Sequence, residues 1–205
     1  MASPQDTTED GFDLQLGTNH VGHFLLAELL TPALLAGAPS RVISLSSAGH
    51  RFSPVDLEDP GFATTEYEPW VAYGRSKTAN ALFAVGYDAR YGEQGVHAFS
   101  LHPGGIQTEL GRHLTEDSLK TLMDAMPKDE ELIWKSIPQG AATTCWAATA
   151  PELDARGGAY LEDCGIAHPM GEGPGRGYAP YAVDSAAAER LWAMSETMVG
   201  QSFSY

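Results

Sequence analysis

Hydrophobic residues recur every three or four positions over two long stretches of the chain, and this is the period of a helix. The first stretch predicts one helix over residues 9–36. Thr7 or Thr8 is its expected N-cap, and Pro32 is a point where it kinks or restarts. The second stretch predicts a helix over about residues 69–92.

Two further helices are expected toward the C-terminus. One begins at Pro138, because proline is favoured in the first turn of a helix. The last covers residues 184–200, with Asp184 as its expected N-cap and Gly200 at its C-terminal end. The segment 106–136, which precedes the helix at Pro138, has a mixed pattern that predicts short helices.

Three short apolar runs are typical of strands, at residues 40–47, 96–105 and 158–163. Helices and strands therefore alternate along the chain. This order implies parallel strands joined by crossover helices, so the sequence predicts an α/β fold with a doubly wound parallel sheet. A length of 205 residues suits a single domain, 1–205, and does not require two.

Charge and cysteine content narrow the classes of partner and compartment. The formal net charge is -15, which argues against a nucleic-acid groove and against docking to an anionic membrane. The most apolar stretch, FLLAELLTPALLAG, is too short to cross a bilayer, and the N-terminus lacks the pattern of a signal peptide. One disulfide can be drawn between Cys145 and Cys164, but a reducing compartment is the simpler reading. We therefore expect a cytoplasmic protein.

The stretch VAYGRSKTANALF, residues 71–83, places Tyr73 and Lys77 four positions apart on the second long helix. Residues at this spacing share a helix face, so the ammonium lies near the phenol. A nearby cation favours the phenolate and lowers the pKa of a tyrosine, which prepares it to exchange a proton with a carbonyl or alcohol oxygen. Taken alone the pair is a weak signal, because two surface residues give the same pattern.

Other polar residues are expected at the same edge of the sheet. Ser46 and Ser47 lie at the C-terminal end of the first strand, and the second strand ends in the turn Pro103-Gly104. Ligands of open α/β sheets bind outside the carboxyl ends of the strands. Asn19 of the first long helix is a further candidate. A serine hydrolase using Ser47 is an alternative, although the chain lacks the G-x-S-x-G sequence of a nucleophile elbow.

Two other motifs are weaker. His20 and His23 lie three positions apart on a helix, but no third ligand is evident, so helix packing is favoured over a metal site. The loop GEGPGRGYAP is rich in glycine but contains Pro174, and no helix opens directly from it. A surface loop near the substrate entrance is therefore favoured over a phosphate-binding loop.

Four motifs in this order resemble the short-chain dehydrogenases/reductases, in particular the branch of the retinol dehydrogenases and the WW-domain oxidoreductase. They are GFDLQLGTNHVGHFLL (11–26), RVISLSSAGH (41–50), YGRSKTANALF (73–83) and LHPGGIQTEL (101–110). The match runs through essentially the whole chain. It implies an oxidoreductase that moves a hydride between a nicotinamide cofactor, NADP or NAD, and a small hydrophobic carbonyl or alcohol substrate.

The resemblance assigns a role to each candidate of the catalytic site. Tyr73 would be the acid/base, and Lys77 would lower its pKa and hold the hydroxyls of the nicotinamide ribose. Ser47, rather than its neighbour Ser46, would polarise the substrate oxygen. Asn19 would position a water in the proton relay.

The resemblance also implies a cofactor contact, a lid and an assembly. The Pro-Gly turn of the family, which lines the nicotinamide and its phosphates, falls on Pro103, Gly104, Ile106 and Thr108. Residues 106–136 and 166–182 are expected to form a lid over the substrate. Family members are often dimers or tetramers, so a homo-oligomer is expected.

The chain departs from the family at its start. Family members begin with a strand, a T-G-x-x-x-G-x-G turn and a helix, and carry an N-N-A-G segment further on; none of these is present. The resemblance therefore predicts a partial Rossmann fold without the first four strands, and an unpaired edge on the strand at 40–47. A second reading stays open: a catalytically inactive remnant that binds a partner or dimerises.

Overall fold

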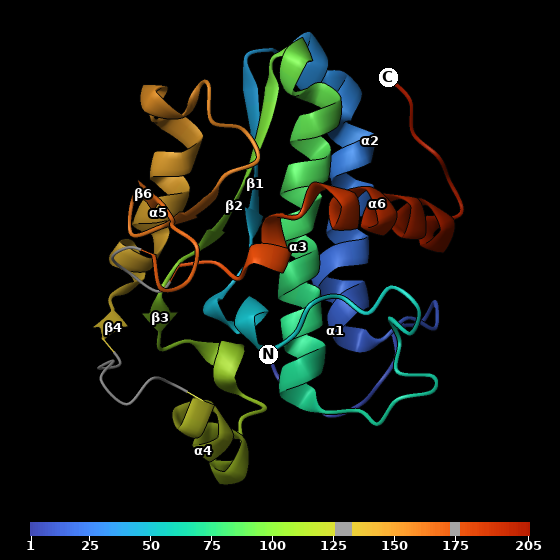
Figure 1. The fold of residues 1–205 in the computed structure, drawn as a ribbon, viewed down its shortest axis with the longest axis vertical. Coiled ribbons are helices and arrows are strands. Elements are labelled where there is room, and N and C mark those ends of the chain that lie inside the picture. Colours follow the sequence, from blue (N-terminus) through green and yellow to red (C-terminus); the bar gives the residue numbers. More distant parts are fainter. Residues whose placement is uncertain (126–132, 173–176) are drawn as a thin grey trace.

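A sheet of four strands lies at the centre of the computed structural model (Figure 1), which describes residues 1–125, 133–172 and 177–205. The strands are ordered β1-β2-β5-β6. The first three run parallel and the last is antiparallel. Their bounds are β1 Ser40–Leu45, β2 Val96–His102, β5 Tyr160–Glu162 and β6 Gly165–Ile166. The predicted α/β fold with a parallel sheet is confirmed, and the short antiparallel β6 is an addition to it.

Helices cover both faces of this sheet (Figure 1). The helices α2 (Gly22–Ala36) and α3 (Pro69–Tyr91) lie on one face, and α6 (Ser185–Val199) packs against α3. The helix α5 (Ile137–Thr149) lies on the other face. The sequence of β2 explains this arrangement, because its side chains alternate between the two faces and are apolar on both.

Two hydrophobic clusters fill the space on either side of β2. Val96 and Ala98 join the cluster of α2, α3 and α6, which contains Phe24 and Trp192. On the opposite face, Phe99 and Leu101 pack with residues of α5 and the turn that follows it. The residues of these two clusters are Phe24, Phe83, Ala84, Tyr87, Tyr91, Val96, Ala98 and Trp192, and Phe99, Leu101, Ala147, Ala150, Leu153 and Leu161.

The first long helix begins later than predicted. It is made of α1 (Leu14–Leu16), a π-helical stretch η1 (Gly17–Val21) and α2, so residues 9–13 are not part of it. Its N-cap is Asp13, whose side chain accepts a hydrogen bond from the Leu16 amide at 2.8 Å. The prediction of Thr7 or Thr8 as N-cap is therefore wrong, because a tight turn at residues 8–12 delays the helix. Pro32 lies within α2 and the helix continues past it.

The other boundaries follow the sequence closely. The predicted strands each lose residues at their ends, where the chain turns away from the sheet. Asp184 and Gly200 cap α6 as predicted, and Pro138 lies in the first turn of α5, whose N-cap is Ser136. Short 3-10 helices occupy several connections: η2 Ala48–Phe52, η3 Gly92–Gln94, η4 Glu109–Gly111, η5 Pro151–Leu153 and η6 Pro180–Val183.

The segment after β2 forms short elements, as predicted. The helix α4 (Glu116–Ala125) follows η4, and a small separate sheet pairs β3 (Gly105–Ile106) with β4 (Trp134–Lys135). Residues 126–132 of the expected lid lie outside the described residues, as do residues 173–176 of the glycine-rich loop, which include Pro174. Within the described ranges, no helix combines the length and the apolar character that crossing a bilayer requires.

The strand β1 lies at the edge of the sheet in the described part of the chain. It pairs with β2 on one side, and its side chains are half-buried or exposed. Leu45 at its carboxyl end is 47% exposed. The predicted unpaired edge on this strand is therefore confirmed for the chain as described.

Candidate active site

Tyr73 and Lys77 lie one turn apart in the first half of α3. The start of this helix is fixed by Glu68, whose side chain accepts a hydrogen bond from the Val71 amide at 2.6 Å, and by Pro69 in the first turn. The Tyr73 side chain is buried, with the residue 3% exposed. The Lys77 Nζ atom lies 5.8 Å from the centroid of the Tyr73 ring.

The carboxyl end of β1 is held against α3 by three hydrogen bonds. Lys77 Nζ donates to the Leu45 carbonyl at 3.0 Å, and Asn80 Nδ2 donates to the same oxygen at 2.8 Å. In return, the Ser46 hydroxyl donates to the Lys77 carbonyl at 2.8 Å. Because the Ser46 hydroxyl hydrogen is used in this way, Ser46 has a structural task, and a chemical role for Ser47 stays a prediction.

Ser47 lies directly beside Tyr73. The two side chains are hydrogen-bonded, and Ser47 Oγ accepts a further hydrogen bond from the Gly49 amide at 3.0 Å. Gly49 packs so close to the Tyr73 ring that an added Cβ would lie 2.6 Å from Tyr73 Cε1. The short turn after β1 therefore brings a hydroxyl to the phenol and leaves no space for a side chain at Gly49.

Burial dominates the electrostatics of the pair. It raises the pKa of Tyr73 above its ordinary value near 10, and the hydrogen bond with Ser47 opposes this only in part. Burial also lowers the pKa of Lys77 to about 8. The direction for Tyr73 is the reverse of the one predicted from the pair alone, because the loss of water around the phenol outweighs the ammonium nearby. At neutral pH the site holds a neutral phenol and a cationic lysine.

Asn19 reaches α3 from the π-helical stretch η1. Its Nδ2 atom donates to Ser76 Oγ at 2.9 Å, and that hydroxyl donates to the Tyr73 carbonyl at 2.8 Å. The carbonyl of Asn19 is hydrogen-bonded to His23 Nδ1 at 2.9 Å. The structure thus places Asn19 beside the helix that carries Tyr73 and Lys77, while its part in a proton relay stays a prediction.

The predicted cofactor turn follows β2 at the same edge of the sheet. Gly104 has a φ of +96°, in the left-handed region that favours glycine. A hydrogen bond of 3.1 Å from the Ala48 amide to His102 Nδ1 joins the end of β2 to the turn that carries Ser47. Thr108 caps η4 through its hydroxyl, and Ile106 belongs to β3.

Lys135 of β4 contacts this turn, and the sequence motifs do not single it out. Its Nζ atom donates to the Pro103 carbonyl at 3.3 Å and forms a short ion pair with Asp163. Its side chain lies over Gly104, where an added Cβ would meet it at 2.6 Å. The sequence around Lys135 does not indicate this contact, because the contact arises from the parallel pairing of β3 with β4.

An apolar cluster surrounds Tyr73. Trp70 and Tyr73 are buried in it together with Ala2, and partly buried apolar side chains surround them, namely Met1, Phe52, Leu114 and Leu122. The Trp70 Nε1 atom donates to the Ser118 carbonyl of α4 at 3.0 Å. The described part of the first predicted lid segment therefore packs over the candidate acid.

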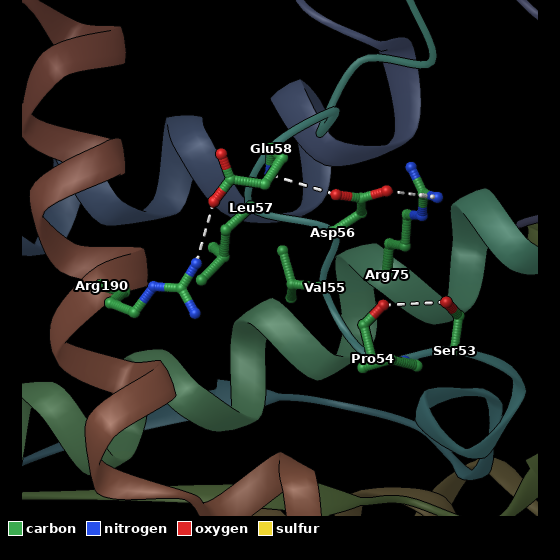
Figure 2. A pocket seen from close by; sticks show the side chains of 8 residues that line it. All are labelled: Ser53, Pro54, Val55, Asp56, Leu57, Glu58, Arg75 and Arg190. Carbon is green, nitrogen blue, oxygen red and sulfur yellow. Dashed lines mark hydrogen bonds and ion pairs between the residues drawn. The ribbon is translucent and has the colours of Figure 1, made fainter. Parts of the chain in front are cut away.

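A hollow of about 390 Å³ beside α3 is separate from this cluster. Figure 2 shows that residues 53–58 line it with Arg75 and Arg190, and that both guanidinium groups are engaged. Arg75 pairs with Asp56 at 3.3 Å, and Arg190 pairs with Glu58 at 3.0 Å. None of the predicted site residues lines this hollow, so it does not mark the chemistry.

The two histidines weighed as metal ligands have different environments. His20 is buried, its Nε2 atom lies 2.7 Å from Ser195 Oγ, and burial lowers its pKa to about 3. His23 is exposed. Among the described residues, no group of three His, Cys, Asp or Glu side chains is placed to hold a metal ion. Cys145 and Cys164 are free thiols.

Comparison with known proteins gives close relatives across the chain. A short-chain dehydrogenase/reductase of Penicillium roqueforti is 43% identical over 208 residues, which cover 98% of this chain and 60% of that protein. Retinol dehydrogenase 13 of Homo sapiens is 38% identical over 200 residues, which cover 98% of this chain and 58% of that protein. The chain thus spans about three fifths of the length of these relatives.

A solved structure supports the same relationship. The crystal structure of an uncharacterized protein from Mycobacterium paratuberculosis matches with a TM-score of 0.70 at 31% identity, and it covers 100% of this chain and 65% of that one. No protein-family model matches the chain.

Proposed function

The chain belongs to the short-chain dehydrogenase/reductase family, and from this premise we propose that it transfers a hydride between a nicotinamide cofactor and the carbonyl carbon of a small hydrophobic substrate. The observation that carries the proposal is the Tyr73 phenol, hydrogen-bonded to Ser47 and one helical turn from Lys77 at the carboxyl end of β1. Tyr73 is the proton donor of the reduction, and the acceptor of that proton in the reverse reaction.

The residues at this edge fit a nicotinamide nucleotide. An ammonium carries three N–H groups, and in the described part of the chain Lys77 spends one of them on the Leu45 carbonyl. The other two are free for ribose hydroxyls. Gly104 supplies a turn in a backbone conformation that other residues rarely adopt. We assign Tyr73, Lys77, Pro103, Gly104, Ile106 and Thr108 to the nucleotide, which is NADP or NAD.

The proton chemistry follows from the environment of Tyr73. The reduced cofactor, when bound, supplies the hydride for the carbonyl carbon. Tyr73 donates its phenolic proton to the carbonyl oxygen, so that an alcohol forms and a phenolate remains on the enzyme. Ser47 donates a hydrogen bond to the same oxygen, and Lys77 stabilises the phenolate. Asn19 is assigned to a water on the path that returns the proton.

The raised pKa of Tyr73 keeps the proton on the phenol at neutral pH. A buried phenol stays protonated below its raised pKa, so the group that must give a proton holds one. The apolar cluster around Trp70, Leu114 and Leu122 favours a hydrophobic substrate, because these side chains border the phenol.

A second candidate function is binding without catalysis. The half-buried edge of β1 and the exposed Leu45 offer a strand that another chain can pair with.

Nucleotide titration separates the two candidates. The purified chain is titrated with NADPH and with NADH, following nucleotide fluorescence, and turnover is measured with a panel of apolar aldehydes and ketones. Saturable binding and reduction support the oxidoreductase, while no binding of either nucleotide favours the second candidate. Tyr73→Phe should lower turnover by roughly 10²–10⁴-fold with the nucleotide Kd changed by less than about threefold. Tyr205→Phe, which removes the same atom from a half-exposed ring near the C-terminus, is the matched control.

A further inference from the structure

We propose that His50 is a positioning residue for Ser47, and that its ring joins the Ser47 backbone to the segment 177–182. The inference rests on the proposed role of Ser47 in the reaction. His50 lies in the 3-10 helix η2 directly after Ser47, and its side chain is completely buried. Its ring contacts the Ser47 carbonyl, the Tyr160 hydroxyl and the Ala179 amide, so it acts through the residues that it holds.

Three donors converge on the carbonyl oxygen of Ser47. The His50 amide donates at 3.0 Å and His50 Nδ1 lies at 2.6 Å. The Tyr160 hydroxyl of β5 donates at 3.2 Å, and the same hydroxyl lies 3.1 Å from His50 Nδ1. A carbonyl oxygen has two lone pairs and rarely has three partners. The backbone of Ser47 is therefore fixed from its own turn and from the neighbouring strand at once.

The second ring nitrogen binds a distant part of the chain. The Ala179 amide donates to His50 Nε2 at 3.0 Å. A backbone amide can only donate and a carbonyl can only accept, so Nε2 carries no hydrogen and Nδ1 carries one. The partners on the two sides thus select the neutral Nδ1–H tautomer. Burial supports this form, because it lowers the pKa of His50 to about 4, and the Arg51 cation acts in the same direction.

The segment 177–182 docks on His50 at a second point as well. The Tyr181 hydroxyl donates to the His50 carbonyl at 2.9 Å. Tyr178 packs on the Tyr160 ring at a centroid distance of 6.1 Å, and the Gly177 amide donates to the Glu162 carboxylate of β5 at 2.9 Å. A movement of this segment would therefore displace His50 and, through the His50 ring, the backbone of Ser47.

The placement of Ser47 matters because its side chain is hydrogen-bonded to Tyr73. Proton transfer depends on distances near 3 Å, and misplacement by about 1 Å from a change outside the chemistry can cost on the order of 10² in rate. If the Ser47 carbonyl lost its hydrogen-bond donors, the Ser47 hydroxyl could move by such a distance. The hydrogen bonds of His50 prevent this movement.

Two substitutions separate the two contacts of the ring. In His50→Asn the side-chain amide nitrogen takes the place of Nδ1 and keeps the donor to Ser47, but the acceptor for the Ala179 amide is lost. In His50→Gln the amide oxygen takes the place of Nε2 and keeps that acceptor, but the donor to Ser47 is lost. His168→Asn, at an exposed histidine near the same segment, is the control.

The first readout is independent of enzyme activity. Nitrogen chemical shifts of the His50 ring in the unsubstituted chain should show an unprotonated Nε2 at neutral pH. Hydrogen exchange of the Ala179 amide should quicken at least about tenfold in His50→Asn, and stay near the parent rate in His50→Gln and in His168→Asn. A protonated Nε2, or equal exchange in all four proteins, overturns the inference even if a variant folds poorly.

The second readout is kinetic and links His50 to the reaction. His50→Gln should lower kcat by at least about tenfold with KM nearly unchanged, because Ser47 is displaced. His50→Asn should raise KM more than it lowers kcat, because the docking of 177–182 is weakened. If both variants lower kcat and raise KM to the same extent, the positioning role is contradicted. If the parent chain has no oxidoreductase activity, the proposed function fails, and the shifts and the Ala179 exchange still decide whether the bridge exists.

Discussion

Gly49 lies directly beside the Tyr73 ring, and a Cβ atom added to it would be 2.6 Å from Cε1 and 2.8 Å from Cδ1 of that ring. Contacts this short are not tolerated between carbon atoms. The ring is buried. The turn after β1 therefore depends on a residue without a side chain at this position, and the same turn carries Ser47.

Gly49→Ala should destabilise the protein and reduce its activity. The methyl group must displace either the Tyr73 ring or the Ser47 turn, and overpacking of this kind costs typically 1–3 kcal/mol. We expect a fall of about that size in the free energy of unfolding, measured by urea denaturation, and a larger relative loss in kcat than in nucleotide affinity. Gly61→Ala is the control, because no atom lies within 4 Å of a Cβ there. Equal effects of the two substitutions would show that the close approach is not what Gly49 provides.

Trp70→Phe should loosen α4 without disturbing the ring packing around Tyr73. The phenyl ring can keep contact with Phe52 and Tyr73, but it loses the hydrogen bond to the Ser118 carbonyl and leaves a small void in place of the rest of the indole. A lost neutral hydrogen bond is worth about 1 kcal/mol, so amide exchange in α4 should rise by roughly fivefold, with KM for apolar substrates rising in step.

The control for this substitution is Trp146→Phe. It removes an indole N–H that donates to Glu152 at 2.9 Å on the other face of the sheet. An unchanged α4 exchange in Trp70→Phe would mean that α4 is held by its apolar contacts alone.

Much of the fold could be predicted from the sequence because it depends on local patterns. The helix α3 has helical periodicity and a proline in its first turn, and α6 has a cap at each end. The alternation of helices and strands then requires parallel pairing. The edges of the strands were placed less well, because a strand ends where its hydrogen bonds end and not where its apolar residues end.

The parts that were missed depend on contacts between distant segments. The first helix starts at Leu14 because residues 8–12 form a tight turn. The sequence does not show this turn, because Thr7 and Thr8 have the side chains of a typical N-cap. The pKa direction of Tyr73 depends on how completely the phenol is covered, and that cover comes from α4 and the N-terminal residues. The hydrogen bond between His50 and Ala179 joins residues 129 positions apart and leaves no trace in the local sequence.

The lowered pKa of Lys77 predicts a rise in stability with pH above about 8. The ammonium loses its proton in the folded state at about 8 and in the unfolded state at about 10.5, so between these values the unfolded chain binds more protons. The free energy of unfolding should therefore increase across this window, by up to about 3 kcal/mol. The difference between the parent chain and Lys77→Met isolates this contribution, and Lys120→Met, at an exposed side chain, should show no such difference.

Glu28 predicts the opposite trend in the acid range. Its side chain is completely buried, Oε2 accepts a hydrogen bond from the Tyr91 hydroxyl at 2.9 Å, and Oε1 has no hydrogen-bond partner among the described residues. Burial raises the pKa of this carboxyl from 4.5 to about 7. The folded state therefore binds more protons between pH 4.5 and 7, and the free energy of unfolding should fall as pH rises through that window, by up to about 3 kcal/mol.

Glu28→Gln tests the origin of this trend, because the amide keeps the shape and an acceptor for Tyr91 but has no charge to desolvate. The variant should be close to the parent chain in stability at pH 4 and more stable at pH 8, so that the difference in unfolding free energy appears across the window in which the folded carboxyl titrates. Glu93→Gln, at an exposed position on the turn after α3, should leave the pH profile of the parent chain intact. If the unfolding free energies of the parent chain and Glu28→Gln ran parallel across this pH range, the proton affinity of Glu28 would be unchanged on folding. Water reaching Oε1 would then have to relieve the cost of burying the carboxylate.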